Sequence, residues 1–312
     1  MSSFIQALPA AVSQGLIWGI MAIGLYITYR ILELSDLTVD GSFCTGGAVC
    51  VMMLLAGQNP IVAMLVAFIA GMATGLVTGF LHTTMKIPAI LAGILTQLGL
   101  WSVNLAIMGQ ANQALSARTP KLVSMLFIKQ VEKGKLPFYQ HPIITVALVI
   151  LVVVAILYWF FGTELGCSIR ATGANSNMAR AQGINTNAKK LIGLMISNGL
   201  VALSGAMLAQ FQGFADINMG RGAIVIGLAS VIIGEVVFGK IFKNFGLKLL
   251  SVAIGAVIYY IVIQAVISLM DIDTDYMKLI SAAIVAVFLA VPNLRGQIFG
   301  GLFKKRKENS HA

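Results

Sequence analysis

Charge is scarce in this sequence. Aspartate, glutamate, lysine and arginine make up 10% of the 312 residues, whereas 58% are hydrophobic and the mean hydropathy is +0.92. A water-soluble chain of this length cannot bury so much apolar side-chain surface. The composition therefore excludes a soluble domain of useful size and predicts a polytopic membrane protein.

Cysteine and histidine are also rare, with three of each. Two cysteines fall within one predicted helix and the third in a polar connection, so no disulfide framework is expected. The histidines are scattered, with no cysteine or carboxylate at metal-ligand spacing around them. No convergent group of His, Asp or Ser suggests an enzyme. We expect no catalytic site, no metal and no cofactor in this chain.

Long uncharged runs fill most of the sequence. Windows such as 6–29, 89–110, 141–163 and 191–215 contain no Asp, Glu, Lys or Arg. Each is long enough as a helix to cross about 30 Å of hydrocarbon, and the runs do not alternate as β-barrel strands do. We predict an all-α protein with about nine transmembrane helices, with eight or ten as alternatives: 10–31, 37–56, 60–81, 88–108, 141–161, 191–212, 222–239, 248–270 and 278–293.

The basic residues are divided unequally between the two sides of these spans. One side holds fourteen of them: Arg30, Lys86, Arg170, Arg180, Lys189, Lys190, Lys240, Lys243, Lys248, Arg295, Lys304, Lys305, Arg306 and Lys307. The other side holds seven, including Arg221. The positive-inside rule places the richer side, with the basic tail 295–312, in the cytoplasm and the N-terminus outside. The net charge of +10 follows from this topology and from attraction to membrane lipid, and we expect no nucleic-acid partner.

Two connections are too long and too polar to be simple turns. The first, 109–140, is predicted to lie outside, where it forms either a flexible loop or a docking surface. The second, 162–190, is cytoplasmic by its charge. There we predict a helix that ends at Arg170, a turn over 171–175 with Asn175 as a helix cap, and a short helix stopped by Gly183.

The second connection carries the strongest functional signal. Its sequence resembles the ATPase-coupling segment of the branched-chain amino acid, sugar and nucleoside permease family of ABC importers: Leu165-Gly166, Arg170-Ala171, Gly173, Asn175, Ala179 and Ala181-x-Gly183-Ile184. Further similarities cover the whole chain, at Leu34-Ser35-Asp36-Leu37-Thr38, at Ala202-Leu203-Ser204-Gly205-Ala206 and at Ala290-Val291-Pro292-Asn293-Leu294-Arg295-Gly296. The run 232–240 departs from the usual family pattern and is similar to a branch associated with aromatic amino acids such as tryptophan.

The resemblance implies a single permease domain over 1–312 of the type II importer fold, in a bacterial inner membrane. It implies a second permease copy, a dimer of cytoplasmic ATPases that hold ATP and Mg²⁺, and an external solute-binding protein. The residues expected to couple to the ATPase are Arg170, Gly173, Asn175, Ala179 and Gly183. No ATP site is expected here, because the string 234–241 has Ile241 where a nucleotide-binding loop needs a hydroxyl.

Small residues and polar residues within the spans have different expected roles. Gly15 with Gly19, and Gly71 with Gly75 and Gly79, are spaced for close helix packing. Polar side chains at membrane depth line a pathway or hydrogen-bond between helices, and the spacing leaves both roles open. The pathway candidates are Asp36, Thr38, Asp40, Ser42, Thr96, Gln97, Asn104 and Gln210; Asn198 and Ser204 are further polar residues of the sixth span.

Two short segments share a pattern of acid, aliphatic, polar and aliphatic residues. Segments 35–40 and 215–220 each precede a helix rich in Gly and Ala, and the topology places them on opposite sides of the membrane. This arrangement is typical of an inverted repeat.

Two other functions remain open at this point. An ion-coupled secondary transporter would carry carboxylates deep in its spans, where this sequence offers only Glu235 near a cytoplasmic end. A sugar or nucleoside solute would suit the same ABC role. We favour uptake of an amino acid.

Overall fold

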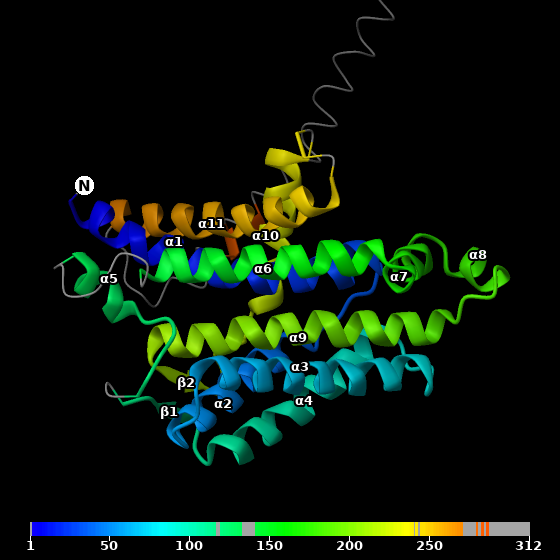
Figure 1. Ribbon diagram of the computed structural model, residues 1–312, viewed down its shortest axis with the longest axis horizontal. Helices are drawn as coiled ribbons and strands as arrows, with labels where there is room; N and C mark the ends of the chain where they lie inside the picture. The colour runs from blue at the N-terminus through cyan, green and yellow to red at the C-terminus, as the bar shows by residue number, and fades with distance from the viewer. Residues whose placement is uncertain are drawn as a thin grey trace, which may run out of the picture.

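The computed structural model describes residues 2–116, 119–132, 141–239, 241–242 and 244–270, with isolated positions at 279, 282–283 and 285–286. Within them the chain is almost entirely helical (Figure 1). The first half contains α1 (Ser2–Tyr26), a π-helical turn (Ile27–Ile31), α2 (Val39–Leu55), α3 (Pro60–Thr83), α4 (Ala89–Met108), β1 (Asn112–Ala114) and α5 (Met125–Glu132). The second contains α6 (Pro142–Gly162), α7 (Glu164–Ala174), α8 (Ser176–Ala181), α9 (Thr186–Gln212), β2 (Phe214–Asp216), α10 (Ala223–Phe238) and α11 (Phe245–Met270).

Among the described residues, six helices are long and apolar enough to span a membrane, namely Ala7–Ile31, Pro60–Thr83, Ala89–Met108, Pro142–Gly162, Thr186–Gln212 and Phe245–Ser268. The helices α2 and α10 are apolar but shorter. The all-α polytopic prediction is therefore confirmed, and the first eight predicted spans each match an apolar helix. The ninth, 278–293, falls mostly outside the described residues, so the count of nine stays a prediction.

The two short helices begin inside the bundle. Ser42, in the first turn of α2, bonds to Asn198, which lies near the middle of the 27-residue α9. With 17 residues, α2 is roughly 25 Å long. Gly220, just before α10, packs directly on the carbonyl of Asp40. Both helices thus start at about half the length of α9.

The two halves of the chain pack on each other reciprocally. Helix α1 packs along α10 and α11, whereas α9 packs along α2 and α3. The helices α1 and α9 run antiparallel at the centre, where Ser204 Oγ donates to Ile17 O and Ser197 Oγ donates to Gly24 O, both at 2.7 Å. The helices α1 and α9 thus each pack along a pair of helices from the other half of the chain.

A small antiparallel sheet closes one end of the bundle. Strand β1, at the start of the 109–140 connection, pairs with β2 through Asn112 opposite Asp216 and Ala114 opposite Phe214. The connection then continues through α5, and residues 133–140 lie outside the described part. Figure 1 shows this sheet and α5 at the end opposite α7 and α8.

Candidate functional site

A buried polar cluster joins the segment before α2 to α3 and α9. Asp36 Oδ1 accepts from the Thr38 backbone N–H at 2.9 Å, and Oδ2 accepts from Asn198 Nδ2 at 2.7 Å. Ser42 Oγ donates to Asn198 Oδ1, and the hydroxyl groups of Thr38 and Thr78 lie 2.7 Å apart. Asp36 is 2% exposed. Of the pathway candidates, Asp36, Thr38 and Ser42 therefore bond between helices in this conformation.

Asn198 was noted in the sequence only as one polar residue of a span, yet it is the hub of this cluster. It bonds to Asp36 and Ser42, and its Nδ2 also donates to Leu194 O at 3.0 Å. The feature of the sequence that indicates this role is an amide side chain on a helix otherwise rich in Gly, Ala and Leu, where a polar group requires a partner.

Asp40 caps the second short helix. Its Oδ2 accepts from Gly222 N at 3.0 Å and its Oδ1 accepts from Ile224 N at 3.1 Å, across 182 and 184 residues of sequence. The carboxylate thereby satisfies free amide groups at the start of α10 and faces the positive end of the helix dipole. Asp40 thus ties the starts of α2 and α10 together.

The segments 35–40 and 215–220 form the same local turn. Asp36 Oδ1 accepts from Thr38 N at 2.9 Å, and Asp216 Oδ1 accepts from Asn218 N at 2.7 Å. The expectation that they lie on opposite sides of the membrane was wrong. The chain after β2 re-enters the bundle along α2, where Cys44 Sγ donates to Asp216 O, so the two segments meet.

Arg221 is a charged residue in a place that the sequence did not predict. The topology counted it on the external side, but it directly precedes Gly222 at the capped start of α10, within the bundle's length, and is exposed. A guanidinium at such depth needs water or protein rather than lipid around it. Arg221 is thus an exposed charge next in sequence to Gly222, the residue that Asp40 caps.

The remaining pathway candidates have separate environments. Thr96 Oγ1 donates to Ala92 O at 3.0 Å, and Gln97 is half-buried on α4 beside Gly41. Asn104 Nδ2 donates to Gly41 O at 3.4 Å, while its buried Oδ1 has no partner among the described residues. Gln210 lies elsewhere, near the sheet end, where its Oε1 accepts from Leu122 N at 2.9 Å. Gln210 therefore anchors the 109–140 connection to α9.

The two sets of spaced glycines, on α3 and on α1, lie where helices approach closely. A Cβ atom at Gly71 or Gly75 would overlap the α9 backbone at Asn198 or Leu194, and one at Gly79 would lie 3.2 Å from Leu191 Cα. On α1, a Cβ at Gly15 would lie 2.8 Å from Val257 Cα, and one at Gly19 would lie 3.1 Å from Ala253 Cα. These contacts bring α3 onto α9 and α1 onto α11.

The coupling segment forms two helices, α7 and α8. The turn expected over 171–175 was wrong for most of its length, because α7 continues to Ala174. The cap is where the pattern placed it: Asn175 Oδ1 accepts from Asn177 N at 3.1 Å and from Met178 N at 3.0 Å. Gly183 has φ +81°, a conformation that suits glycine, and ends the short helix.

The coupling candidates differ in their access to a partner. Gly173 packs on the carbonyl of Ile31, so a Cβ atom there would overlap it, and Ala179 is 4% exposed. Gly173 therefore holds α7 against the π-helical turn, and Ala179 is inaccessible to a partner. Arg170, Asn175 and Gly183 are exposed, and so is Met178 on α8, at 60%.

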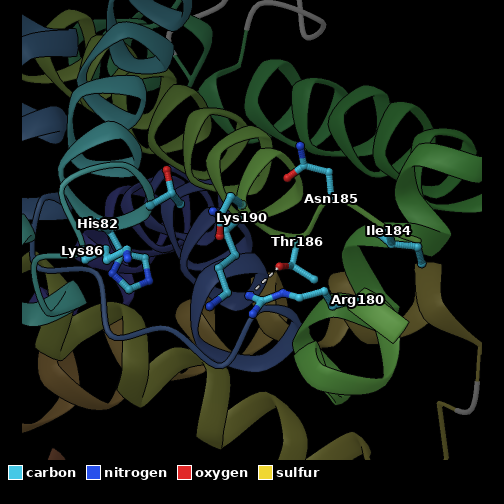
Figure 2. Close-up of a pocket in the computed structure, with 9 residues that line it drawn as sticks. His82, Lys86, Arg180, Ile184, Asn185, Thr186 and Lys190 are labelled. Carbon is cyan, nitrogen blue, oxygen red and sulfur yellow. Dashed lines mark hydrogen bonds between the residues drawn. The ribbon is translucent and has the colours of Figure 1, made fainter. Parts of the chain in front are cut away.

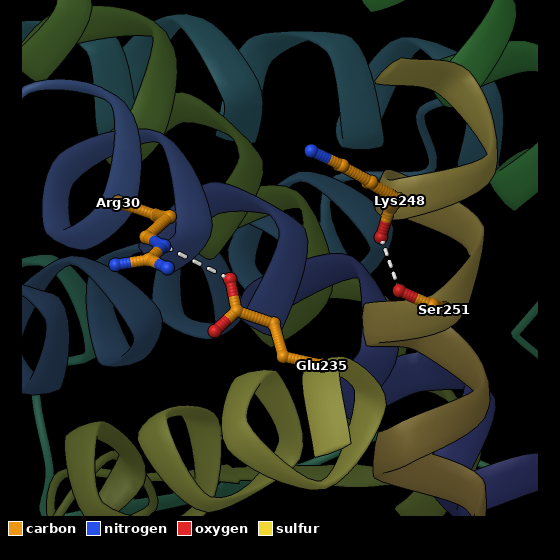
Figure 3. Close-up of polar contacts among 4 residues, drawn as sticks. All are labelled: Arg30, Glu235, Lys248 and Ser251. Carbon is orange, nitrogen blue, oxygen red and sulfur yellow. Dashed lines mark hydrogen bonds and ion pairs between the residues drawn. The ribbon is translucent and has the colours of Figure 1, made fainter. Parts of the chain in front are cut away.

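An ion pair links the two halves near the same end. Arg30 Nε, in the π-helical turn, lies 3.0 Å from Glu235 Oε1 on α10 (Figure 3). Their side chains are 59% and 36% exposed, so solvent screens the pair. The ion pair thus joins the π-helical turn that follows α1 to the last turn of α10.

Comparison with known proteins agrees with this arrangement. The family model described as "Branched-chain amino acid transport system / permease component" matches residues 8–302. A tyrosine transport system permease protein of Clostridioides difficile is 40% identical over 285 residues, which is 91% of each chain. An uncharacterized protein of Rickettsia prowazekii is 34% identical over 91% of this chain and 96% of its own. An autoinducer 2 import system permease protein of Salmonella paratyphi B is 26% identical over 74% of this chain and 64% of its own.

Among solved structures, PsaBC from Streptococcus pneumoniae in complex with Fab is similar, with a TM-score of 0.52. The alignment covers 93% of this chain and 94% of the other at 13% identity, so the likeness concerns the fold alone.

Proposed function

Because the chain belongs to the branched-chain amino acid transport system permease family of ABC importers, we propose that it forms the membrane pathway of an importer for an aromatic amino acid. The observation that carries this proposal is the 40% identity to a tyrosine transport permease over 91% of both chains. The lower identity to an autoinducer 2 permease gives less support to a sugar-like solute. Family membership also decides against the ion-coupled secondary transporter.

The partners follow from this assignment. The importer consists of two permease copies, an ATPase dimer that holds ATP and Mg²⁺, and an external solute-binding protein. It lies in the inner membrane with the C-terminus in the cytoplasm. The basic residues Lys86, Arg180 and Lys190 lie together beside the coupling segment, which supports this orientation.

In the coupling step, the ATPase binds the exposed tip of α8 around Met178, with Arg170, Asn175 and Gly183 beside it. Gly173 and Ala179 transmit the movement because they pack α7 and α8 against the bundle. The α7 helix contacts the end of the π-helical turn through Gly173, so a displacement of α8 reaches α1 and, through Arg30 and Glu235, α10.

The pathway passes the starts of α2 and α10. Arg221 carries a charge that can bind the carboxylate of an amino acid, and Asp40 carries one that can bind its ammonium group. We place these two charges on the side of the bundle that faces the second permease copy. The Asp36 cluster stays buried behind them and holds the two short helices in position.

The test is reconstitution in liposomes with the ATPase and binding protein encoded beside the permease. We expect ATP-dependent uptake of labelled tyrosine or tryptophan, competed by unlabelled aromatic amino acids and not by ribose. Uptake that follows an ion gradient with the permease alone would overturn the ABC role. Uptake of ribose in place of the amino acids would overturn the solute class.

Arg221 is tested in the same liposomes. Arg221→Gln should raise the KM for the amino acid, and Arg221→Lys should restore most of the affinity. The control is Lys121→Gln, which removes a positive charge from the external connection. An unchanged KM for Arg221→Gln excludes it from the solute site.

A further inference from the structure

A cavity of about 560 Å³ opens beside the coupling segment, between the end of α3, the end of α8 and the start of α9. Figure 2 shows its composition: His82 and Lys86 lie on one side, Arg180 and Ile184 on the other, and Lys190 between them. Asn185 and Thr186 complete the rim. The cavity therefore lies between the membrane-spanning helix α3 and α8, the helix that we propose to contact the ATPase.

The charge of this cavity is one-sided. Lys86, Arg180 and Lys190 line it, and no carboxylate of the described residues does. None of the three forms an ion pair within the described part of the chain. Three cations that share a concave space without a counter-ion repel one another, so binding of an anion there is favoured.

Local structure holds the cavity open and directs its donors. Lys86 has φ +57°, and His82 Nδ1 lies 2.9 Å from Ile87 O, a contact that closes the turn after α3. Arg180 Nη2 donates to Thr186 Oγ1 at 3.2 Å, which orients the guanidinium and leaves its other N–H groups for a ligand. The start of α9 adds the positive end of a long helix dipole to the side-chain charges.

We propose that this cavity is a binding site for a phosphate group, which connects α3 to α8 and α9. Guanidinium and ammonium donors that line one cavity suit the tetrahedral oxygens of a phosphate mono- or diester. Two sources share that chemistry, an anionic lipid headgroup and a free phosphate. The neighbouring Phe80 and Met85 are 47% and 58% exposed and offer an apolar surface next to the site, which fits the acyl chains of a lipid.

A bound phosphate would affect transport by changing how α8 packs beside α3. It would neutralise the repulsion between Lys86 and Arg180, which lie on separate elements, and so hold α8 near α3. The cavity shares no residue with the proposed solute site, so anion binding does not depend on which solute is transported.

The test uses the full-length permease, purified and stripped of lipid. Phosphatidylglycerol, phosphatidylcholine and inorganic phosphate are added separately, and binding is measured by native mass spectrometry and by the shift in melting temperature. We expect phosphatidylglycerol or phosphate to bind and to raise the melting temperature, and phosphatidylcholine to do neither. Preference for phosphatidylglycerol identifies the lipid source, and preference for phosphate identifies the soluble one.

Matched variants separate this site from general attraction to basic residues. Lys86→Gln and Lys190→Gln should each weaken binding of the preferred anion about ten-fold, the loss of one charge-assisted contact. Lys189→Gln removes the same charge one position away, outside the cavity lining, and should bind like the unmodified protein. A normal melting temperature without ligand shows that each variant is folded.

Three results would overturn the proposal. The first is that neither anion binds to the unmodified permease. The second is that Lys189→Gln weakens binding as much as Lys190→Gln does. The third is that anion binding is unchanged in Lys86→Gln and Lys190→Gln while both variants lose affinity for the ATPase subunit, which would assign the cavity to a carboxylate of that partner.

Discussion

Asn198 Nδ2 on α9 donates a hydrogen bond of 2.7 Å to Oδ2 of Asp36, and this bond spans 162 residues of sequence. It places an amide from the middle of a long helix against a carboxylate that is 2% exposed. The pair holds the unwound segment before α2 in position. Asp40, four residues later, can then reach the start of α10.

Removal of the amide should destabilise the fold. In Asn198→Ala the buried oxygens of Asp36 lose a donor, and we expect the free energy of unfolding to fall by about 2 kcal/mol. Equilibrium unfolding in detergent measures the loss. Gln212→Ala, at the exposed end of the same helix, is the control and should change little. Equal losses in the two variants would contradict the role of the cluster.

The contact between α3 and α9 should depend on Gly75. Gly75→Leu forces a side chain into the carbonyl of Leu194, so we expect loss of the monodisperse folded protein. Gly99→Leu is the matched control, because nothing lies within 4 Å of a Cβ atom at Gly99 on α4. Size-exclusion chromatography of both variants measures the difference. A normal profile for Gly75→Leu would show that the helices can separate at little cost.

The cap formed by Asp40 should contribute to the stability of α10. In Asp40→Ala the amides of Gly222 and Ile224 lose their acceptor, and we expect a loss of about 1 kcal/mol. Hydrogen exchange at the start of α10 should speed up while exchange in α3 stays unchanged. Glu33→Ala, an exposed acid outside the cap, serves as the comparison. Unchanged protection of α10 would show that its start does not need the carboxylate.

The two sides of α8 should respond differently to substitution. Met178→Asp changes a side chain that is 60% exposed, so the permease should fold normally but lose transport and the stimulation of the ATPase. Ala179→Leu enlarges a side chain that is 4% exposed and should lower the melting temperature. Melting curves and coupled ATPase assays distinguish them. Full transport by Met178→Asp would place the ATPase contact elsewhere.

The sequence correctly predicted features that depend on local pattern. The Asn175 cap and the glycine stop at Gly183 were visible because caps use particular residues at fixed positions in the chain. The glycine spacing on α3 was visible because residues four apart share a helix face. The helix through Ala174 was missed, because Gly173 within it signals a turn in sequence and becomes a close packing contact only when Ile31 lies beside it.

The surroundings of Arg221 and Gln210 could not be predicted from the sequence for a related reason. The topology assumed that each connection stays on its own side, so it treated the chain between α9 and α10 as external. In the fold that chain pairs through β2 and then re-enters along α2. Gln210, a pathway candidate by its position in a span, accepts a hydrogen bond from Leu122 of the 109–140 connection.

Composition and the length of the uncharged runs alone determined that this protein crosses a membrane many times, because lipid is the only solvent that tolerates so much apolar surface. The order of residues in the coupling segment also indicated the family. Only the tertiary structure decided which polar groups are consumed by packing and which remain for a ligand. That depends on where α2 and α10 begin, and the partners of those two helix starts lie more than 150 residues away in the chain.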